Sequence, residues 1–422
     1  MILLTYLSFY ANILNQFNSL IIFFIMRIAF IGQKGIPVVY GGVERRVQEI
    51  SARMASMGHE VFVFARKGYN NKDIKKYKKV KIIYLPTIKA KHFETIIHTF
   101  LSTLYVLFNN FEVVHYQAPG PSSLSWMVKL FRPDIALIAT FNSRDSKHQK
   151  WGRLARAYLN FGEWVINKVP DKTIVVGEVL RSYVEKRFNE KPVIVRNGSA
   201  ILKTSEFKKS KILNKWKLKK DKYFILVNRL IRHKGIDYAM KAFDNAHKKK
   251  RIPEDFKLVV VGDSSYTDDY LNYLKDLSKI NKNIILVGNQ IGKNLAMLYY
   301  SSFNFIQPSE AEGLSNSLLE AMGYGKAPVF SDIPENLAPV QGNGFIFENK
   351  NIKDLEDKMV FSIDNKKITK EIGKKAKKHV EENYSWDFNV EKTLSLYKKI
   401  MLQKKSNYAS IIKKTLLRIN IF

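Results

Sequence analysis

The stretch Arg27–Arg66 begins with "RIAFIG" (27–32), continues with "VERRVQEISARMASMG" (43–58) and ends with "VFVFAR" (61–66). The two outer runs are short and apolar, as in buried strands, and the middle run has the apolar spacing of an amphipathic helix. Gly58 can end that helix in a left-handed conformation. The stretch therefore predicts strand, helix and strand in succession, which is the unit of a parallel sheet covered by helices.

The same alternation runs through the chain in two series. The first continues with "KIIYLP" (81–86), "VVHYQ" (113–117), "IALIATF" (135–141), "KTIVVG" (172–177) and "PVIVRNG" (192–198), with helices expected over 93–108, near 122–131 and after His148. It pauses in the lysine-rich segment 203–222 and restarts with "YFILVNRL" (223–230), "KLVVVGD" (257–263), "NIILVG" (283–288), "FNFIQPS" (303–309) and "APVFSD" (327–332). A chain of 422 residues also exceeds what one hydrophobic core usually serves. We therefore predict an α/β protein of two doubly wound domains, 26–200 and 201–383, with ligands in the cleft between them.

The two ends of the chain differ from these domains. Residues 1–25 carry no charge, but Asn12, Asn15, Gln16 and Asn18 interrupt the apolar run, so neither a signal peptide nor a spanning helix fits well. Either this extension is a mis-assigned start, with the domain beginning at Met26, or it is a segment lying on a membrane. Within the last part, 384–422, the tail "KKSNYASIIKKTLLRINIF" (404–422) alternates Lys and Arg with Ile, Leu and Phe at helical spacing. It is either a helix for an anionic lipid surface or a frayed tail.

The charge of the chain limits its partners. Seventy Lys and Arg against 38 Asp and Glu give a formal net charge of +32, which attracts nucleic acid, anionic lipid or phosphorylated ligands. Neither zinc-finger spacing nor an RNP-like run is present, so we expect no specific nucleic-acid partner. The chain has no cysteine, which fits a reducing compartment. We expect a cytoplasmic protein, peripheral at the inner face of the cell membrane.

Two segments of the second series carry the candidate site. In "SEAEGLSNSLLEAMGYG" (309–325), Glu312 lies in a loop before a helix and Glu320 lies two turns into that helix. The free N–H groups of a helix N-terminus favour an anion such as a phosphate. In "VNRLIRHKG" (227–235), Arg229 and Lys234 leave the carboxyl end of a strand, where basic side chains reach the cleft. The alternative is that both are ordinary surface charges.

The order of these residues resembles the retaining, two-domain sugar-nucleotide glycosyltransferases of family 4, which have the GT-B fold. The shared pattern is Arg-x4-Lys-Gly after one strand, Pro-Ser-x2-Glu-Gly before a helix, and a second Glu eight residues after the first. The resemblance extends from about Met26 to Met401. It implies two Rossmann-like domains facing across a cleft, with the last helix, "YSWDFNVEKTLSLYKKIM" (384–401), crossing back onto the first domain.

The resemblance also implies roles for individual residues. Arg229 and Lys234 would bind the donor diphosphate, Glu312 would contact the sugar hydroxyls, and Glu320 would take the ribose hydroxyls. N–H groups would come from Gly313, Leu314 and Ser315.

The first domain resembles a narrower, rhamnosyltransferase-like branch with the pattern GIP-x2-YGG-x-E, here "GIPVVYGGVERRV" (35–47). Gly41 and Gly42 would let the backbone approach the donor closely. Asn142 stands where many family members carry His or Asp, and an amide can only orient an acceptor by hydrogen bonds. Asp145 matches an acidic position of the branch and is the expected acid, although a helix N-cap role is an alternative.

Together these features predict a hexosyl- or deoxyhexosyltransferase. It would move a sugar from a nucleoside-diphosphate sugar to a hydroxyl of a saccharide acceptor, on a lipid carrier, in cell-surface polysaccharide synthesis. The sequence has no Asp-x-Asp pair, so we expect no metal, and no cofactor besides the donor substrate. Two alternatives stay open: a sugar-nucleotide epimerase of the same fold, or an inactive basic protein that binds a membrane surface or nucleic acid.

Overall fold

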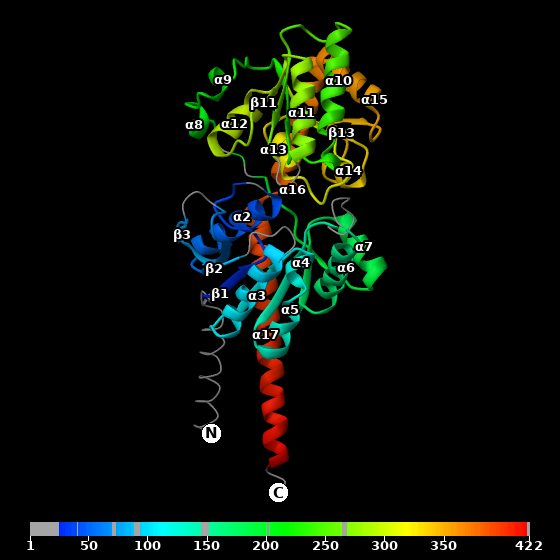
Figure 1. Cartoon of the computed structure of the whole chain (residues 1–422). Coiled ribbons are helices and arrows are strands. Elements are labelled where there is room, and N and C mark those ends of the chain that lie inside the picture. The colour runs from blue at the N-terminus through cyan, green and yellow to red at the C-terminus, as the bar shows by residue number, and fades with distance from the viewer. Residues whose placement is uncertain are drawn as a thin grey trace, which may run out of the picture.

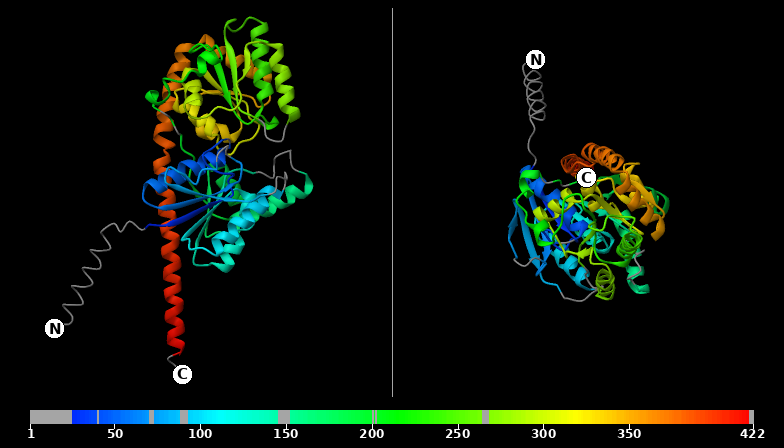
Figure 2. Two further views of the ribbon diagram at one scale, coloured as in Figure 1. Left: turned by 60° about the vertical axis from the view of Figure 1, so that its left-hand side comes forward. Right: turned by 90° about the horizontal axis from the view of Figure 1, so that it is seen from above.

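A computed structural model of the chain describes residues 25–39, 41–69, 73–87, 93–144, 152–199, 201, 203–263 and 268–419, with side chains described as far as residue 407. Two lobes are stacked, and one long helix runs down the side of the lower lobe and beyond it (Figures 1 and 2). The interpretations of residues 1–24 and of Asp145 concern positions outside the described residues.

The first lobe is built on an eight-stranded sheet in the order β3-β4-β2-β1-β5-β6-β7-β8. The strands are β1 (Arg27–Ile31), β2 (Glu60–Arg66), β3 (Lys76–Tyr77), β4 (Val80–Leu85), β5 (Val113–Gln117), β6 (Ala136–Phe141), β7 (Lys172–Val175) and β8 (Val193–Ile194). The helices are α2 (Gly42–Ser56), α3 (Phe93–Leu107), α4 (Pro119–Ser122), α5 (Ser125–Phe131), α6 (Arg153–Lys168) and α7 (Glu178–Phe188). Every pair of neighbouring strands is parallel except β3 with β4.

The second lobe is built on a six-stranded parallel sheet in the order β11-β10-β9-β12-β13-β14. Its strands are β9 (Tyr223–Val227), β10 (Lys257–Val261), β11 (Ile284–Leu286), β12 (Asn304–Gln307), β13 (Val329–Ser331) and β14 (Phe345–Phe347). Its helices are α8 (Thr204–Phe207), α9 (Ile212–Lys215), η2 (Arg232–Lys234), α10 (Ile236–Lys248), α11 (Asp268–Ile280), α12 (Gly292–Ser301), α13 (Asn316–Gly323), α14 (Pro334–Val340), α15 (Ile352–Asp364) and α16 (Lys366–Asn383). The prediction of two doubly wound, parallel-sheet domains is confirmed.

Two local features differ from the expected alternation. The lysine run at 75–81 forms a small edge hairpin, in which Tyr77 pairs with Val80 and the two lysines between them have positive φ. The lysine-rich segment 203–222 holds the short helices α8 and α9. Both segments lack a regular apolar period, so pattern reading does not find them.

The final helix, α17 (Trp386–Ile419), belongs to the core of the first lobe. Its residues Val390, Leu394, Tyr397 and Met401 recur at helical spacing and pack among the buried residues of β1 and β2. The crossover that was expected for this helix is therefore present. Among the described residues, no helix combines the length and the apolar character needed to span a membrane.

The two crossings between the lobes lie side by side. The backbone N–H of Ser199 donates to the carbonyl oxygen of Tyr384 at 2.9 Å. A Cβ at Gly198 would lie 2.5 Å from the Trp386 ring, so only glycine fits there without a shift. We call these two adjoining segments, the outgoing and the returning one, the hinge.

Candidate active site

The basic residues of the site lie in the segment that follows the carboxyl end of β9. After this strand the chain runs through Asn228 and Arg229 into the single turn η2, which ends with Lys234. Gly235 then adopts φ +63°, and a Cβ there would lie 2.1 Å from the carbonyl oxygen of Pro308. Glycine at this position thus brings the loop after β9 against the loop after β12.

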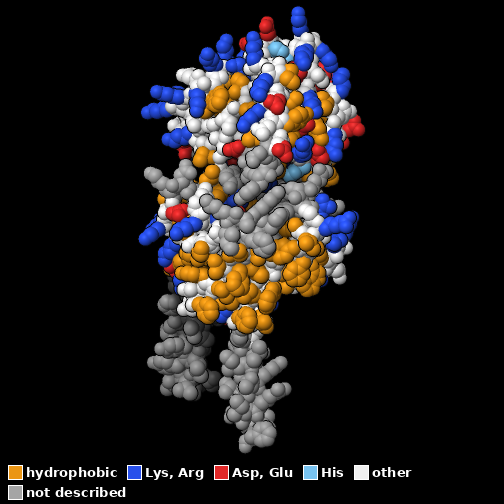
Figure 3. Space-filling model, viewed as in Figure 1, with side chains coloured by type: hydrophobic (Ala, Val, Ile, Leu, Met, Phe, Trp, Pro, Cys, Tyr) orange, Lys and Arg blue, Asp and Glu red, His pale blue; other side chains and the backbone are white. Residues whose placement is uncertain are grey.

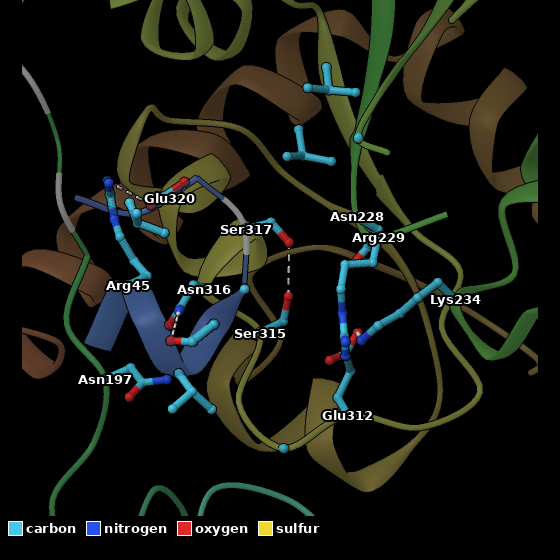
Figure 4. A pocket seen from close by; sticks show the side chains of 18 of the residues that line it. Arg45, Asn197, Asn228, Arg229, Lys234, Glu312, Ser315, Asn316, Ser317 and Glu320 are labelled. Atoms are coloured by element: carbon cyan, nitrogen blue, oxygen red, sulfur yellow. Dashed lines mark hydrogen bonds and ion pairs between the residues drawn. The ribbon is translucent and has the colours of Figure 1, made fainter. Parts of the chain in front are cut away.

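The second loop follows β12 and leads into α13. Ser315 is the N-cap of α13, and its hydroxyl accepts the backbone N–H of Leu318 at 3.3 Å. The hydroxyls of Ser315 and Ser317 are 3.0 Å apart at the mouth of the helix (Figure 4). The start of α13 therefore presents helix-end N–H groups and two hydroxyls to the cleft.

Lys234 and Glu312 form a buried ion pair. The Lys234 Nζ lies 2.6 Å from Glu312 Oε1, and the two side chains are 10% and 7% exposed. Gln307 also donates to Glu312 Oε1 at 2.7 Å. Figure 4 shows the Arg229 and Lys234 side chains extending to the same carboxylate. Burial lowers the pKa of Lys234 and the neighbouring Arg229 lowers it further, while Glu312 opposes both by favouring the cation.

Glu320 lies at another part of the same cleft and faces the first lobe. Its Oε1 lies 3.2 Å from Nη2 of Arg45, which comes from α2. Burial raises the pKa of Glu320 above its ordinary value, and the Arg45 guanidinium opposes that rise. Glu320, which the resemblance assigns to ligand binding, is thus paired with Arg45 of the first lobe in this structure.

The glycine loop of the first lobe closes over the site. Gly41 has φ +105°, which favours glycine, and it precedes α2 directly. Asn316 donates to the carbonyl oxygen of Gly42 at 3.3 Å, and Asn289 donates to that of Val39 at 2.7 Å. Side chains of the second lobe therefore bind the backbone of this loop across the cleft.

Asn142 contacts the loop of the second lobe that follows β12. A Cβ at Gly313 would lie 2.1 Å from the backbone oxygen of Asn142, so the two backbones approach closely. The Asn142 side chain donates to the carbonyl oxygen of Thr140 at 3.3 Å. Asp145, the expected acid, lies outside the described residues, and its role stays a prediction.

A cavity of about 500 Å³ lies between the lobes, which is within the usual size of small-molecule sites. Its lining includes Arg229, Lys234, Glu312, Gly313, Leu314, Ser315 and Glu320 from the second lobe and Gly41, Gly42 and Asn142 from the first. The described candidate residues are therefore brought together. Two cations and a helix mouth at one end of the cavity make a site for a strongly charged anion.

The two lobes match two families. The Glycosyltransferase Family 4 model matches residues 40–199, and the Glycosyl transferases group 1 model matches residues 208–379. Each lobe is thus similar to a glycosyltransferase family, and the two lobes together have the GT-B fold.

The curated relatives of the chain are distant. An uncharacterized glycosyltransferase of Methanocaldococcus jannaschii is 28% identical over 243 residues, covering 56% of this chain and 59% of the relative. A poly(ribitol-phosphate) alpha-N-acetylglucosaminyltransferase of Staphylococcus aureus is 26% identical over 174 residues, covering 40% of this chain and 34% of the relative. The chain thus spans about a third to three fifths of the length of these two relatives.

Solved structures share the two-lobed fold of this chain. Sucrose-phosphate synthase from Thermosynechococcus elongatus superimposes with a TM-score of 0.76 at 19% identity, covering 90% of this chain and all of the other. HepE from Anabaena, in complex with UDP and glucose, gives a TM-score of 0.72 at 15% identity over 89% of this chain and all of the other.

Three residues of the cleft were not predicted from the sequence: Arg45, Asn197 and Asn289. Asn197, on the outgoing hinge segment, accepts from the buried Arg46 at 2.7 Å and donates to the carbonyl oxygen of Leu314 at 3.5 Å. Asn197 stands in the quoted run "PVIVRNG" directly before the linker, and that position was the only signal for it. Arg45 and Asn289 act across the cleft, and no pattern within one domain marks such contacts.

Proposed function

We propose that the chain transfers a sugar from a nucleoside-diphosphate sugar to a hydroxyl of a saccharide acceptor, with retention at the anomeric carbon. The observation that carries this proposal is the meeting of Arg229, Lys234 and the start of α13 in one interdomain cavity. Two cations and a helix N-terminus suit a pyrophosphate, whose charge grows as it leaves the sugar.

In the proposed complex the diphosphate lies between Arg229, Lys234 and the α13 mouth. Glu312, the ion-pair partner of Lys234, opposes the effect of burial on the pKa of that lysine and contacts the hydroxyls of the donor sugar. Glu320 takes the ribose hydroxyls. This arrangement requires the carboxylate of Glu320 to exchange part of its contact with Arg45 for the nucleotide.

The proposed reaction needs no protein nucleophile. The bond between the anomeric carbon and the phosphate oxygen breaks, and the acceptor hydroxyl forms a new bond to that carbon on the same face. The proton of the acceptor hydroxyl passes to the departing phosphate oxygen. The enzyme contributes positioning and stabilisation of the leaving group.

We further propose an acceptor held on a lipid carrier at the inner face of the cell membrane, with Asn142 and Asp145 facing it. The S. aureus relative that acts on poly(ribitol-phosphate) supports a role in making cell-surface polymers. The rhamnosyltransferase-like motif at 35–47 supports a hexose or deoxyhexose donor.

The test starts with the donor. Thermal shifts with UDP, GDP and dTDP identify the base, and incubation with the matching sugar nucleotides, with and without a lipid-linked acceptor, measures transfer. The proposal expects a nucleotide-induced rise in melting temperature and acceptor-dependent release of the nucleoside diphosphate. Isomerised sugar nucleotide without transfer would identify an epimerase, and no binding of any nucleotide would refute the proposal.

A further inference from the structure

The surface of the first lobe carries a helix whose exposed side has almost no charge. After Glu94, α3 contains no Asp, Glu, Lys or Arg, and its one imidazole, that of His98, is buried. Burial lowers the pKa of His98 to about 4, so this ring is neutral at physiological pH. Phe100 is exposed, and Phe108 directly after the helix is 84% exposed. A surface helix that contacts only water normally has charged residues on its exposed side.

Two neighbouring helices extend this apolar surface. α5, which packs against α3, exposes Trp126 and Phe131, and α6, which packs against α5, exposes Leu154 and Trp164. The Trp164 ring stacks on that of Phe161 at a centroid distance of 6.4 Å. Figure 3 shows the result as one apolar band across the lower front of the first lobe. We call the exposed side of α3, α5 and α6 the aromatic face.

The exposed apolar residues of the aromatic face are grouped, unlike those on the second lobe. On the second lobe the exposed large apolar residues lie on separate elements, such as Ile280 on α11, Ile346 on β14 and Phe361 on α15. Single exposed apolar residues are ordinary, whereas a contiguous group marks a binding surface.

We propose that the aromatic face docks on an anionic lipid bilayer. Tryptophan, tyrosine and phenylalanine side chains suit the boundary between headgroups and acyl chains, where an apolar ring and a polar surrounding meet. Arg153 and Arg156 are exposed on α6 next to Leu154, and the chain carries a net charge of +32. A second copy of the chain would bring the same positive charge to this surface, while anionic headgroups complement it.

The position of α17 agrees with this occupant. Lys404 of α17 donates to the carbonyl oxygen of Pro133 at 2.7 Å and pairs with Asp171 at 2.8 Å, so the helix leaves the lobe beside the end of α5. It then continues to Ile419 and extends beyond the same end of the molecule (Figures 1 and 2). Residues 404–419 include five Lys or Arg and no Asp or Glu, so the sequence of this segment adds positive charge to the part of the helix that extends past the first lobe.

The aromatic face also borders the cleft. α6 follows β6, whose carboxyl end leads to Asn142 in the cavity, so the Leu154 end of α6 lies toward the cleft. A docked enzyme would therefore meet a lipid-carried acceptor next to its active site. The surface is inferred from exposure and charge alone, whereas this purpose rests on the proposed function.

The test measures binding of the full chain to vesicles of equal phosphatidylglycerol and phosphatidylcholine, and to vesicles of phosphatidylcholine alone. We expect binding to the anionic vesicles and at least about tenfold weaker binding for the triple variant Trp126→Ser, Phe131→Ser, Trp164→Ser, because each change removes an exposed ring. The matched control is Ile280→Ser, Ile346→Ser, Phe361→Ser on the second lobe, which should bind like the unmodified chain.

A second variant separates docking from folding. Trp126→Phe with Trp164→Phe keeps the aromatic face apolar, so vesicle binding should persist while quenching of tryptophan fluorescence by brominated lipid falls. Failure of the unmodified chain to bind, full binding by the serine triple variant, equal affinity for neutral vesicles, or a dimer in solution that the serine variant abolishes would each overturn the proposal. The UDP thermal shift, run in parallel, reports on the donor site independently of the vesicles.

Discussion

Arg45 and Glu320 form an ion pair across the cleft at 3.2 Å, although 275 positions separate them in the chain. The pair joins the helix after the glycine loop to the helix that opens the proposed donor site. Glu320 also faces Tyr299 and lies near Glu49 of α2, and burial raises its pKa above the ordinary value. In the proposed complex, the same carboxylate would link the relative position of the lobes to nucleotide binding.

The raised pKa of Glu320 leads us to expect that nucleotide affinity depends on pH. In the proposed complex the ionised carboxylate accepts the ribose hydroxyls, so we expect full affinity above the raised pKa of Glu320 and a loss of affinity as the pH drops through it. Arg45 and Tyr299 keep their protons over this range, because the pKa of each lies above its already high ordinary value. Calorimetry with the nucleotide between about pH 5 and 8 measures the slope. Glu320→Gln should bind more weakly at pH 8, and its affinity should change less with pH than that of the unmodified chain.

Lys234→Ala should lower turnover by at least about a hundredfold, because a leaving-group contact of this kind contributes on the order of 3 kcal/mol. Gln307 still donates to Glu312 in the variant, so the fold should survive. Initial rates of nucleotide release, with a melting curve, measure both effects. Lys241→Ala on α10 removes a more exposed lysine paired with Asp237 and serves as the control. A Lys234 variant that folds and retains its rate would remove this lysine from the mechanism.

The sequence predicts the parts of this site that depend on one domain. Arg229, Lys234 and Glu312 each follow a strand of the same sheet, and the carboxyl ends of parallel strands share one edge, so their meeting follows from the topology. Arg45 was not predicted because its contact depends on how two separately folded lobes face each other. The hairpin at Lys76–Tyr77 was not predicted because its residues are mostly charged and have no strand-like alternation.

Replacing the buried Arg46 should strongly lower the stability of the fold. Its guanidinium is fully buried and donates to the carbonyl oxygens of Val195 and Arg196 and to Asn197 Oδ1, which ties α2 to the hinge. Burial lowers the pKa of Arg46 to about 10, still above neutral pH, so it remains charged there. Arg46→Met leaves these acceptors unpaired and should lower the free energy of unfolding by about 3 kcal/mol.

Urea unfolding of the Arg46 variant measures this loss. Arg53→Met, on the same helix, removes a more exposed arginine that pairs with Glu49 and Asp387, and should cost about 1 kcal/mol or less. Equal losses of unfolding free energy in the two variants would show that the buried contacts of Arg46 contribute no more to stability than the exposed ion pairs of Arg53.

Gly313→Ala tests whether the lobes must approach as closely as they do here. The added methyl group would lie 2.1 Å from the backbone oxygen of Asn142, so the two loops have to separate. We expect transfer to fall at least about tenfold, since the acceptor side and the donor side of the cleft no longer align. Small-angle scattering should show a larger radius of gyration for the variant. Gly177→Ala, where an added Cβ meets open space, should leave both measurements unchanged. Unchanged scattering and transfer in the Gly313 variant would mean that the catalytic arrangement tolerates a wider cleft.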